Sequence, residues 1–224
     1  MYDVITFDCY GTLIDWEAGI AQAISTAARA AGVSVRRDEV MRAYLEVEPA
    51  VQAAEYRSYR EVLCQAAART AALLGWSVKP EHAEFLADSL PQWHPFPDTN
   101  DALRQLKADG YRLGILSNVD DGLLEGTLRN LSVDFDFLVT AESVRSYKPA
   151  CGHFLQARKI VGGARWLHAA QSYFHDVEPA RELDVPVVWV NRNGEVPSGE
   201  ARPTAEVADL MGLVRWLRAA TRTL

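Results

Sequence analysis

The segment Val4-Ile-Thr-Phe-Asp-Cys-Tyr-Gly-Thr-Leu13 decides the fold. Residues Val4 to Phe7 form a short apolar run rich in β-branched and aromatic side chains, which predicts a buried strand. Asp8 ends this run and Gly11 follows it, as expected where a strand passes into a loop. The sequence therefore predicts a carboxylate at the carboxyl end of the first strand.

Similar apolar runs recur along the chain and are separated by segments with helical character. They predict strands over Arg112 to Leu116, Phe135 to Val139, Trp166 to Ala170 and Val187 to Val190. The helix-like segments lie near residues 100–125, 150–161 and 177–183. Because strands that alternate with helices form a parallel sheet covered on both faces, we expect an α/β fold. The apolar spacing from about Thr204 to Arg222 predicts a closing amphipathic helix.

A long stretch without any strand-like run, residues 16–93, separates the first strand from the second. It predicts helices over Glu17 to Ala31, from Asp38 to about Leu74 with interruptions near Pro49, and over Glu81 to Leu90. Gly32, Gly75 and Pro91 are the expected stops. The three prolines of segment 91–98 predict a linker that returns to the sheet. We therefore expect a helical cap over residues 16–93 and a core of residues 1–15 and 94–224.

The composition narrows the class of protein and its surroundings. The chain has 224 residues and is 49% hydrophobic, which is enough to bury a sizeable core. Its net charge of −7 disfavours binding to nucleic acid or to an anionic membrane surface. The three widely spaced cysteines, Cys9, Cys64 and Cys151, predict free thiols in a reducing compartment. With no basic leader and no uncharged apolar run of membrane-spanning length, we expect a cytoplasmic protein.

Polar residues follow four of the expected strands, at the edge where a parallel sheet binds ligands. They are Asp8, the hydroxyl–amide pair Ser117-Asn118, Lys148 and Asp176. Each residue alone would fit ordinary turn or helix-capping chemistry. Because all four fall at the ends of successive strands, we expect them to form one site.

Four segments of this chain, with a helical insert after the first, resemble the haloacid dehalogenase (HAD) superfamily. They are Phe7-Asp-Cys-Tyr-Gly-Thr-Leu13, Leu116-Ser-Asn118, Tyr147-Lys-Pro149 and Asp176, and the similarity runs from Asp3 to about Gly194. The resemblance implies a Rossmann-like core of parallel strands with an inserted helical cap.

Most members of this superfamily are Mg²⁺-dependent phosphatases that carry two acids which this chain lacks. Tyr10 stands where the phosphatases have a second aspartate, and a tyrosine with a pKa near 10 is a poor general acid at neutral pH. Gln171 stands where they have a metal-binding acid. The Asp-x-Tyr-Gly-Thr-Leu pattern instead resembles L-2-haloacid dehalogenases. It implies hydrolytic dehalogenation of short-chain 2-haloacids through an aspartyl ester, with no metal and no cofactor.

The resemblance also implies roles for individual residues. Asp8 attacks the halogen-bearing C2 of the substrate, and water then cleaves the aspartyl ester. Lys148 keeps Asp8 ionised and balances the substrate carboxylate, because two anions in a dry pocket need a cation. Thr12 and Asp176 support Lys148 and the hydrolytic water. The implied binding groups are the Ser117 hydroxyl, the backbone amides of Cys9 and Tyr10, Asn118 with Arg42 at the halide, and Ser172 and Tyr173 on the loop after the fourth strand. Arg57 and Arg60 stay open as alternatives to Arg42.

The chain departs from the dehalogenase pattern at three positions. Phe154 stands where a tyrosine is usual, and Gln171 and Tyr173 align with a serine and an asparagine. Two other functions therefore stay open, namely a Mg²⁺-dependent phosphatase of a small metabolite and a non-catalytic binder of small carboxylates. A homodimer is also left open. We expect His168 to be a packed, hydrogen-bonded residue inside its strand, with His175 as one option for a contact with water in the pocket.

Overall fold

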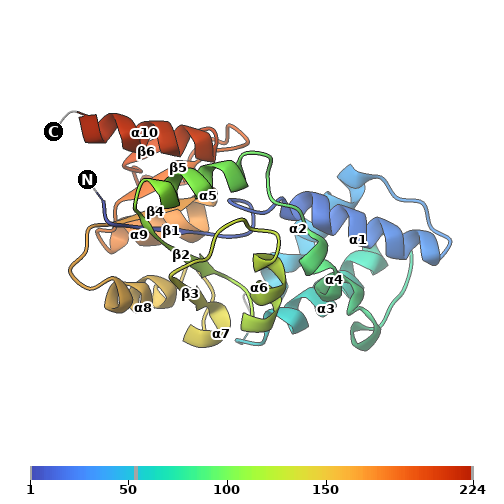
Figure 1. The fold of residues 1–224 in the computed structure, drawn as a ribbon. Coiled ribbons are helices and arrows are strands. Elements are labelled where there is room, and N and C mark those ends of the chain that lie inside the picture. Colours follow the sequence, from blue (N-terminus) through green and yellow to red (C-terminus); the bar gives the residue numbers. More distant parts are fainter. Residues whose placement is uncertain (1, 53–54, 223–224) are drawn as a thin grey trace. The chain divides into compact units, whose positions relative to one another are not determined.

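The computed structural model describes residues 2–52 and 55–222, and a parallel β-sheet organises the core (Figure 1). Its strands lie in the order β3-β2-β1-β4-β5-β6, and every neighbouring pair is parallel. The strands are β1 (Val4–Phe7), β2 (Arg112–Ser117), β3 (Phe137–Thr140), β4 (Trp166–Ala170), β5 (Val187–Val190) and β6 (Ala205–Val207). The order reverses at β1, so β2 and β4 flank the strand that carries Asp8. An open sheet binds ligands at such a reversal.

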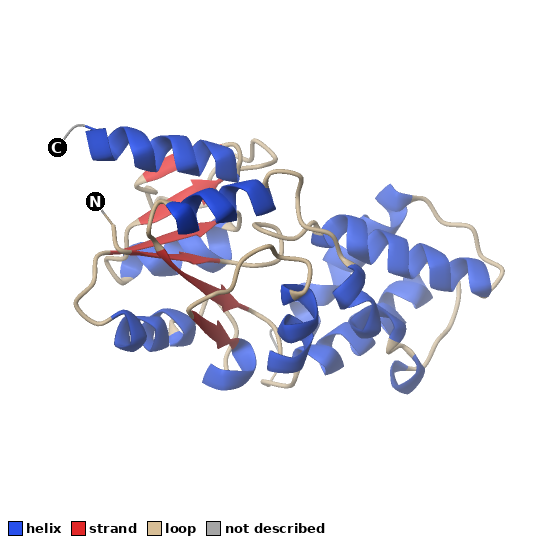
Figure 2. Ribbon diagram, in the orientation of Figure 1, coloured by secondary structure: helices blue, strands red, loops and turns tan. Residues whose placement is uncertain are grey.

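Helices cover both faces of this sheet, as Figure 2 shows. Helices α5 (Thr99–Ala108) and α10 (Leu210–Arg222) pack together on one face. The other face carries α8 (Gly152–Val161) and α9 (Glu178–Glu182). The short helix α7 (Ala141–Val144) follows β3, and a π-helical turn, η3 (Tyr173–Val177), follows β4. Strands β1, β4 and β5 are buried along their whole length, which confirms the α/β fold expected from the apolar runs.

The structure corrects the expected elements near the carboxyl terminus. Residues from Thr204 onward were expected to form a helix, but β6 comes first and α10 begins only at Leu210. The backbone N–H of Thr204 donates to the Val187 carbonyl, so this segment pairs as an edge strand beside β5. A three-residue edge strand is held by backbone hydrogen bonds and leaves little trace in the side-chain pattern. Strand β3 also lies slightly later than the expected 135–139.

A second compact unit comprises residues 15–94 and 119–129, and the regular elements among its described residues are all helices. Its helices are α1 (Trp16–Ala30), α2 (Arg37–Gln52), α3 (Tyr59–Leu73), α4 (Phe85–Ser89) and α6 (Asp121–Leu128), with 3₁₀ turns η1 (Pro80–His82) and η2 (Leu90–Gln92). Residues 119–129 were assigned to the core from sequence. In the structure they join this helical unit, because the Asp120 carboxylate accepts the backbone N–H groups of Tyr59 and Arg60 at the start of α3.

Two of the expected helix boundaries in this unit are wrong. Pro49 was expected to interrupt a helix, yet it lies inside α2, which continues to Gln52. A proline removes the bond to the carbonyl four residues earlier, here that of Leu45, and both residues are exposed to water that can solvate it. The helix expected over 81–90 is divided into η1, α4 and η2. The expected linker 91–98 begins within η2.

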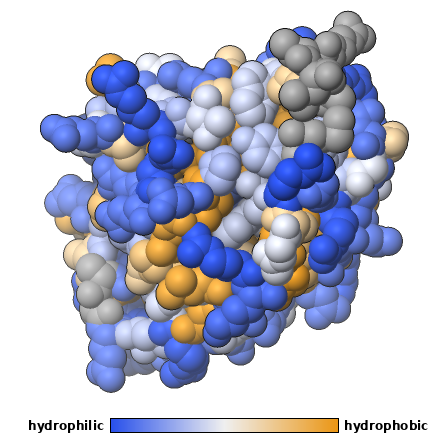
Figure 3. All heavy atoms as spheres, turned by 90° about the vertical axis from the view of Figure 1, so that its left-hand side faces the viewer, coloured by the Kyte–Doolittle hydropathy of each residue, from blue (hydrophilic) through white to orange (hydrophobic). Residues whose placement is uncertain are grey.

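The cysteines, the helices and the surface are relevant to the expected reducing, cytoplasmic location of the chain. Cys9, Cys64 and Cys151 are free thiols, as expected. Among the residues that the structure describes, no helix is long and apolar enough to cross a membrane. On the face in Figure 3, hydrophobic residues gather in a band flanked by hydrophilic ones. The cytoplasmic location and the homodimer stay predictions.

Candidate active site

Asp8 lies in the first turn after β1, at the end of the sheet where the strand order reverses. Its backbone N–H donates to the Ala169 carbonyl of β4, which continues the ladder by one residue and fixes the start of the loop. Gly11 has φ +99°, a conformation that glycine adopts without strain, and it folds the loop back so that the Gly11 N–H donates to the Ile14 carbonyl. The Asp8 side chain is 10% exposed, so this carboxylate is largely buried but keeps limited access to solvent.

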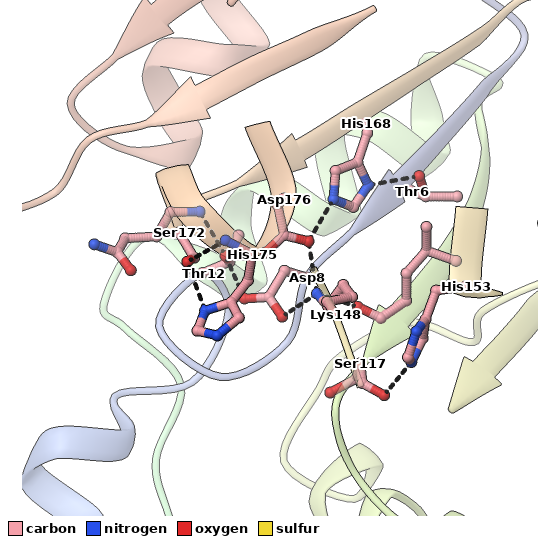
Figure 4. Close-up of polar contacts among 12 residues, drawn as sticks. Thr6, Asp8, Thr12, Ser117, Lys148, His153, His168, Ser172, His175 and Asp176 are labelled. Carbon is pink, nitrogen blue, oxygen red and sulfur yellow. Dashed lines mark hydrogen bonds and ion pairs between the residues drawn. The ribbon is translucent and has the colours of Figure 1, made fainter. Parts of the chain in front are cut away.

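The Lys148 ammonium joins two carboxylates, Asp8 from the loop after β1 and Asp176 from η3 (Figure 4). Its Nζ lies 2.9 Å from Asp8 Oδ1 and 2.6 Å from Asp176 Oδ1, and it also donates to the Leu116 carbonyl at 2.9 Å. All three donor hydrogens of the ammonium therefore have acceptors. Lys148 is 2% exposed and Asp176 is fully buried, so this cation is held in one place.

Thr12 fixes the second oxygen of Asp8. Its Oγ1 donates to Asp8 Oδ2 at 2.9 Å and accepts the backbone N–H of Gln171 at 2.9 Å. Thr12 thus connects the loop after β1 to the loop after β4. It orients the Asp8 carboxylate directly. The role expected for Thr12, support of Lys148 and of the hydrolytic water, stays a prediction.

The three buried charges shift one another's protonation equilibria. Burial raises the pKa of the Asp8 carboxyl and the Asp176 carboxylate adds to the rise, which Lys148 and Thr12 only partly oppose. Burial also disfavours ionised Asp176, but the Lys148 ammonium and the His168 hydrogen bond outweigh it and lower its pKa to about 2. Burial would lower the pKa of Lys148, yet its two carboxylate partners raise it above the ordinary lysine value. Lys148 and Asp176 therefore stay charged at neutral pH.

Ser117 and His153 form a buried polar pair at the end of β2. His153 Nε2 lies 3.0 Å from the Ser117 carbonyl, so Nε2 carries the hydrogen and donates it. Burial, with a further contribution from Lys148, lowers the pKa of His153 to about 3, which keeps the ring neutral. The Ser117 hydroxyl is buried and has no protein partner among the described residues. An unsatisfied buried hydroxyl beside a charged cluster is suited to binding a polar ligand.

Asn118 holds the lysine-bearing loop. Its Oδ1 accepts the Lys148 backbone N–H at 2.7 Å, and its Nδ2 donates to the Lys148 carbonyl at 3.0 Å. These paired bonds fix the backbone from which the Lys148 side chain extends. A halide contact by Asn118 stays a prediction.

The loop after β4 places its side chains differently from the sequence-based expectation. Gln171 donates its side-chain amide to Glu195 at 2.9 Å. Tyr173 was expected to bind substrate, but it is buried, packs against the Trp189 ring and donates its hydroxyl to the Ala201 carbonyl. We therefore leave Tyr173 out of the site. Ser172 accepts the His175 backbone N–H, and its Oγ lies 3.0 Å from His175 Nδ1.

The backbone amides of Cys9 and Tyr10 follow Asp8 directly in the loop that Gly11 folds back. Burial raises the pKa of the Cys9 thiol well above its usual value, and the neighbouring Asp8 adds to this rise. A thiol that stays protonated is a poor nucleophile. Asp8 is therefore the nucleophile candidate of this loop.

The three arginine candidates belong to the helical unit and have partners there. Arg42 on α2 is exposed and lies 3.6 Å from Asp38. Arg57 donates to Gln65 at 2.9 Å, and Arg60 pairs with Asp88 at 2.8 Å. A halide-binding role for any of these arginines stays a prediction.

Sequence reasoning missed one residue that contacts the site. His168 was expected to be a packed, hydrogen-bonded strand histidine, and it is fully buried in β4. Its contact with the site was not foreseen: Nε2 lies 3.0 Å from Asp176 Oδ1, while Nδ1 lies 2.8 Å from Thr6 Oγ1. One feature of the sequence could have indicated this contact: Thr6 and His168 are polar residues inside otherwise apolar strands. In the structure these two residues lie directly opposite each other on β1 and β4.

This chain resembles known proteins along most of its length. A model of the haloacid dehalogenase-like hydrolases matches residues 2–165. The chain therefore belongs to the haloacid dehalogenase-like hydrolase family. It is 30% identical over 219 residues to (S)-2-haloacid dehalogenase of Pseudomonas putida, covering 95% of both chains. It is 27% identical to haloacetate dehalogenase H-2 of Moraxella sp. (strain B), covering 86% of this chain and 87% of that protein.

The fold is also similar to those of solved haloacid dehalogenase structures. L-2-haloacid dehalogenase from Xanthobacter autotrophicus superposes with a TM-score of 0.82 and 22% identity, covering 97% of this chain and 99% of that chain. At this level of identity the match bears on the fold, and it confirms the expected α/β architecture.

Proposed function

We propose that this chain hydrolyses short-chain 2-haloacids to 2-hydroxyacids and halide through an ester on Asp8. The observation that carries the proposal is the buried Asp8 carboxylate, held at one oxygen by Lys148 and at the other by Thr12. Such a carboxylate is oriented, weakly solvated and therefore suited to nucleophilic attack. The full-length relative named (S)-2-haloacid dehalogenase supports this substrate class and the (S) enantiomer.

In the first half of the reaction an Asp8 oxygen forms a bond to C2 of the substrate. The carbon–halogen bond breaks on the opposite side, and the halide leaves with the bonding electrons. Lys148 opposes the effect of burial and so keeps a larger share of Asp8 ionised. Attack from the side opposite the halogen inverts the configuration at C2.

The substrate carboxylate needs uncharged hydrogen-bond donors, because the site already holds two negative charges, on Asp8 and Asp176, against the one positive charge of Lys148. The Ser117 hydroxyl has an open hydrogen-bonding capacity at the end of β2. The backbone amides of Cys9 and Tyr10 lie in the loop that begins with Asp8. These groups bind the substrate carboxylate and orient C2 toward Asp8.

In the second half water attacks the carboxyl carbon of the Asp8 ester. Asp176 has one oxygen, Oδ2, that is buried and without a protein partner among the described residues. That oxygen accepts a proton from the water as its oxygen bonds to the ester carbon. The ester bond then breaks and releases the 2-hydroxyacid.

The residues at this site do not fit a divalent cation, which weighs against the phosphatase alternative. Gln171, at the position of the metal-binding acid, turns its amide to Glu195. Both Asp8 and Asp176 are already paired with the Lys148 ammonium. Within residues 2–52 and 55–222, no group of three His, Cys, Asp or Glu side chains is arranged to hold a metal ion.

Halide release is the direct test. The purified chain is incubated with (S)- and (R)-2-chloropropionate, chloroacetate, bromoacetate and fluoroacetate, each with and without excess EDTA. We expect release from at least one of these acids, a preference for the (S) over the (R) enantiomer, and no effect of the chelator. Turnover of p-nitrophenyl phosphate only with Mg²⁺, without halide release, would establish the phosphatase function instead. Ligand-induced thermal stabilisation by the haloacids without any product would favour the non-catalytic binder.

A further inference from the structure

A chain of buried hydrogen bonds runs from Trp166 to the catalytic cluster (Figure 4 shows its part from Thr6 onward). Trp166 Nε1 donates to Thr6 Oγ1 at 2.7 Å, and Thr6 Oγ1 lies 2.8 Å from His168 Nδ1. His168 Nε2 lies 3.0 Å from Asp176 Oδ1. Thr6 and His168 are partners across β1 and β4, and both are fully buried. The three residues therefore reach Asp176 from inside the sheet.

The direction of each hydrogen bond follows from its chemistry. An indole N–H can only donate, so Thr6 Oγ1 accepts from Trp166. The structure gives the Thr6 hydroxyl no other acceptor among the described residues than His168 Nδ1, so its hydrogen goes there. Nδ1 is then the unprotonated nitrogen, and Nε2 carries the hydrogen that is donated to Asp176. Trp166 and Thr6 thus select the tautomer of His168.

The same contacts argue against a proton-relay role for His168. If both ring nitrogens were protonated, Thr6 Oγ1 would face two N–H donors, and its own hydrogen would have no acceptor. The Phe154 ring also packs edge-on against the imidazole, with the centroids 5.1 Å apart and the planes at 78°, which restrains the ring. His168 is therefore built to donate one fixed hydrogen bond.

The hydrogen bond from His168 makes the two oxygens of the Asp176 carboxylate differ in their partners. Oδ1 receives both Lys148 Nζ and His168 Nε2, whereas Oδ2 receives no protein donor within the described residues. Turning the carboxylate away would break two buried hydrogen bonds and leave a donor hydrogen of Lys148 Nζ and one of His168 Nε2 without an acceptor. The orientation of Oδ2 is therefore fixed relative to Lys148, and Lys148 also holds Asp8.

We infer that His168, locked by Thr6 and Trp166, is a positioning residue that presents Asp176 Oδ2 to the water that hydrolyses the Asp8 ester. This inference rests on the proposed function. One water proton moves to Asp176 Oδ2 while the water oxygen bonds to the Asp8 carboxyl carbon. The bond from that carbon to the alkoxide oxygen breaks, and Asp176 returns its proton to the alkoxide. The second water proton leaves the Asp8 carboxyl for solvent.

Two substitutions at one position separate positioning from packing. His168→Gln places an amide N–H near the position of Nε2, whereas His168→Leu fills the space without a donor. With (S)-2-chloropropionate, we expect His168→Leu to retain the first burst of halide release. Its steady-state kcat should fall by about tenfold or more, and the ester should accumulate on the Asp8 peptide in rapid-quench mass spectrometry. His168→Gln should recover most of the loss, and His82→Leu on the exposed turn η1 should match the parent.

Three outcomes would overturn the inference: His168→Leu turns over like the parent, both half-reactions slow by the same factor, or His168→Gln is no better than His168→Leu. Circular dichroism and thermal melts check the fold of each variant.

¹⁵N NMR of the parent tests the hydrogen-bond chain without any substrate. We expect the Nε2–H tautomer at His168 and a loss of that preference in Thr6→Val, which applies even where His168→Leu fails to fold. An Nδ1–H tautomer in the parent would sink the inference although halide is released. Absence of halide release by the parent would instead sink the proposed function.

Discussion

Lys148 forms a buried ion pair with Asp8 in which Nζ lies 2.9 Å from Oδ1, and the same ammonium also pairs with Asp176. Two carboxylates and one ammonium leave the cluster with a net charge of −1 when all three are ionised. A substrate carboxylate would add a second unbalanced charge. The site therefore depends on Lys148 more than on any other side chain to balance negative charge. Uncharged donors such as the Ser117 hydroxyl stabilise the negative charge that Lys148 does not balance.

Replacing Lys148 by alanine should impair catalysis severely. The change leaves Asp8 and Asp176 buried without their cation, so Asp8 becomes harder to ionise. We expect a loss of about 3 kcal/mol or more in kcat/KM for 2-chloropropionate, which is more than about a hundredfold. Steady-state halide release measures the effect, with the fold checked by circular dichroism.

Lys159→Ala is the matched control, since Lys159 lies on α8 and is exposed. An exposed lysine of this kind should change kcat/KM by less than about 0.5 kcal/mol. Parent-like kinetics in folded Lys148→Ala would remove this lysine from the site.

The Asp8 ester can be detected by isotope labelling. In a single turnover with excess enzyme in H₂¹⁸O, the label should enter the Asp8 carboxyl first and reach the hydroxyacid only in later turnovers. Asp8→Asn should abolish turnover. Direct appearance of ¹⁸O in the first product molecule would mean that water attacks the substrate itself, and Asp8 would then be a base and not the nucleophile.

Much of the core and its charged residues could be predicted because each depends on local sequence. Strands β1, β4 and β5 are continuous apolar runs, and a parallel sheet brings their carboxyl ends together. This rule predicts that Asp8, Lys148 and Asp176 lie near one another, and the structure brings the three together. The edge strand β6 was missed because backbone pairing with β5, and not side-chain pattern, creates it.

The finer contacts depend on strand register and side-chain rotamers, which cannot be read directly from a single sequence. The hydrogen bond between Thr6 and His168 exists only because β1 and β4 align these two residues. The Tyr173 hydroxyl could have faced the site or the core, and packing against Trp189 directs it to the Ala201 carbonyl. Asn118 likewise binds the Lys148 backbone, which turn chemistry alone does not reveal.

The pH dependence of kcat/KM should have a low limb set by Asp8. Burial raises the pKa of Asp8 above the ordinary 3.8, so activity should fall on acidification with a midpoint above that value. The carboxylates raise the pKa of Lys148 above 10.5, so no alkaline limb is expected below about pH 10. Initial rates across a pH series with 2-chloropropionate measure both limbs. An acid midpoint below 3.8, or a decline near pH 8, would contradict this assignment of charges.

Asp8→Asn and Asp176→Asn, the same chemical change at two positions, should affect the free energy of unfolding differently, because the pKa values of the two carboxyls shift in opposite directions. The lowered pKa of Asp176, about 2 against 3.8 for an ordinary aspartate, means that its ionised form stabilises the fold at every pH well above 3.8. That stabilisation is lost as the pH falls from about 4 through 2. Asp8 has a raised pKa, so its ionisation costs stability as the pH rises through its folded value.

Asp176→Asn should therefore lower the free energy of unfolding at pH 7 by about 2–4 kcal/mol, because a buried partner of Lys148 and His168 is lost. Asp8→Asn should leave the free energy of unfolding equal to or higher than that of the parent, because Lys148 keeps Asp176 and one costly buried charge disappears. Urea denaturation of the three proteins at pH 7 measures both values. The deficit of Asp176→Asn should shrink when the comparison is repeated at pH 4 and below. Equal destabilisation by the two substitutions would show that Asp8 and Asp176 contribute alike to the fold, against the opposite pKa shifts that the burial and hydrogen bonding of this cluster produce.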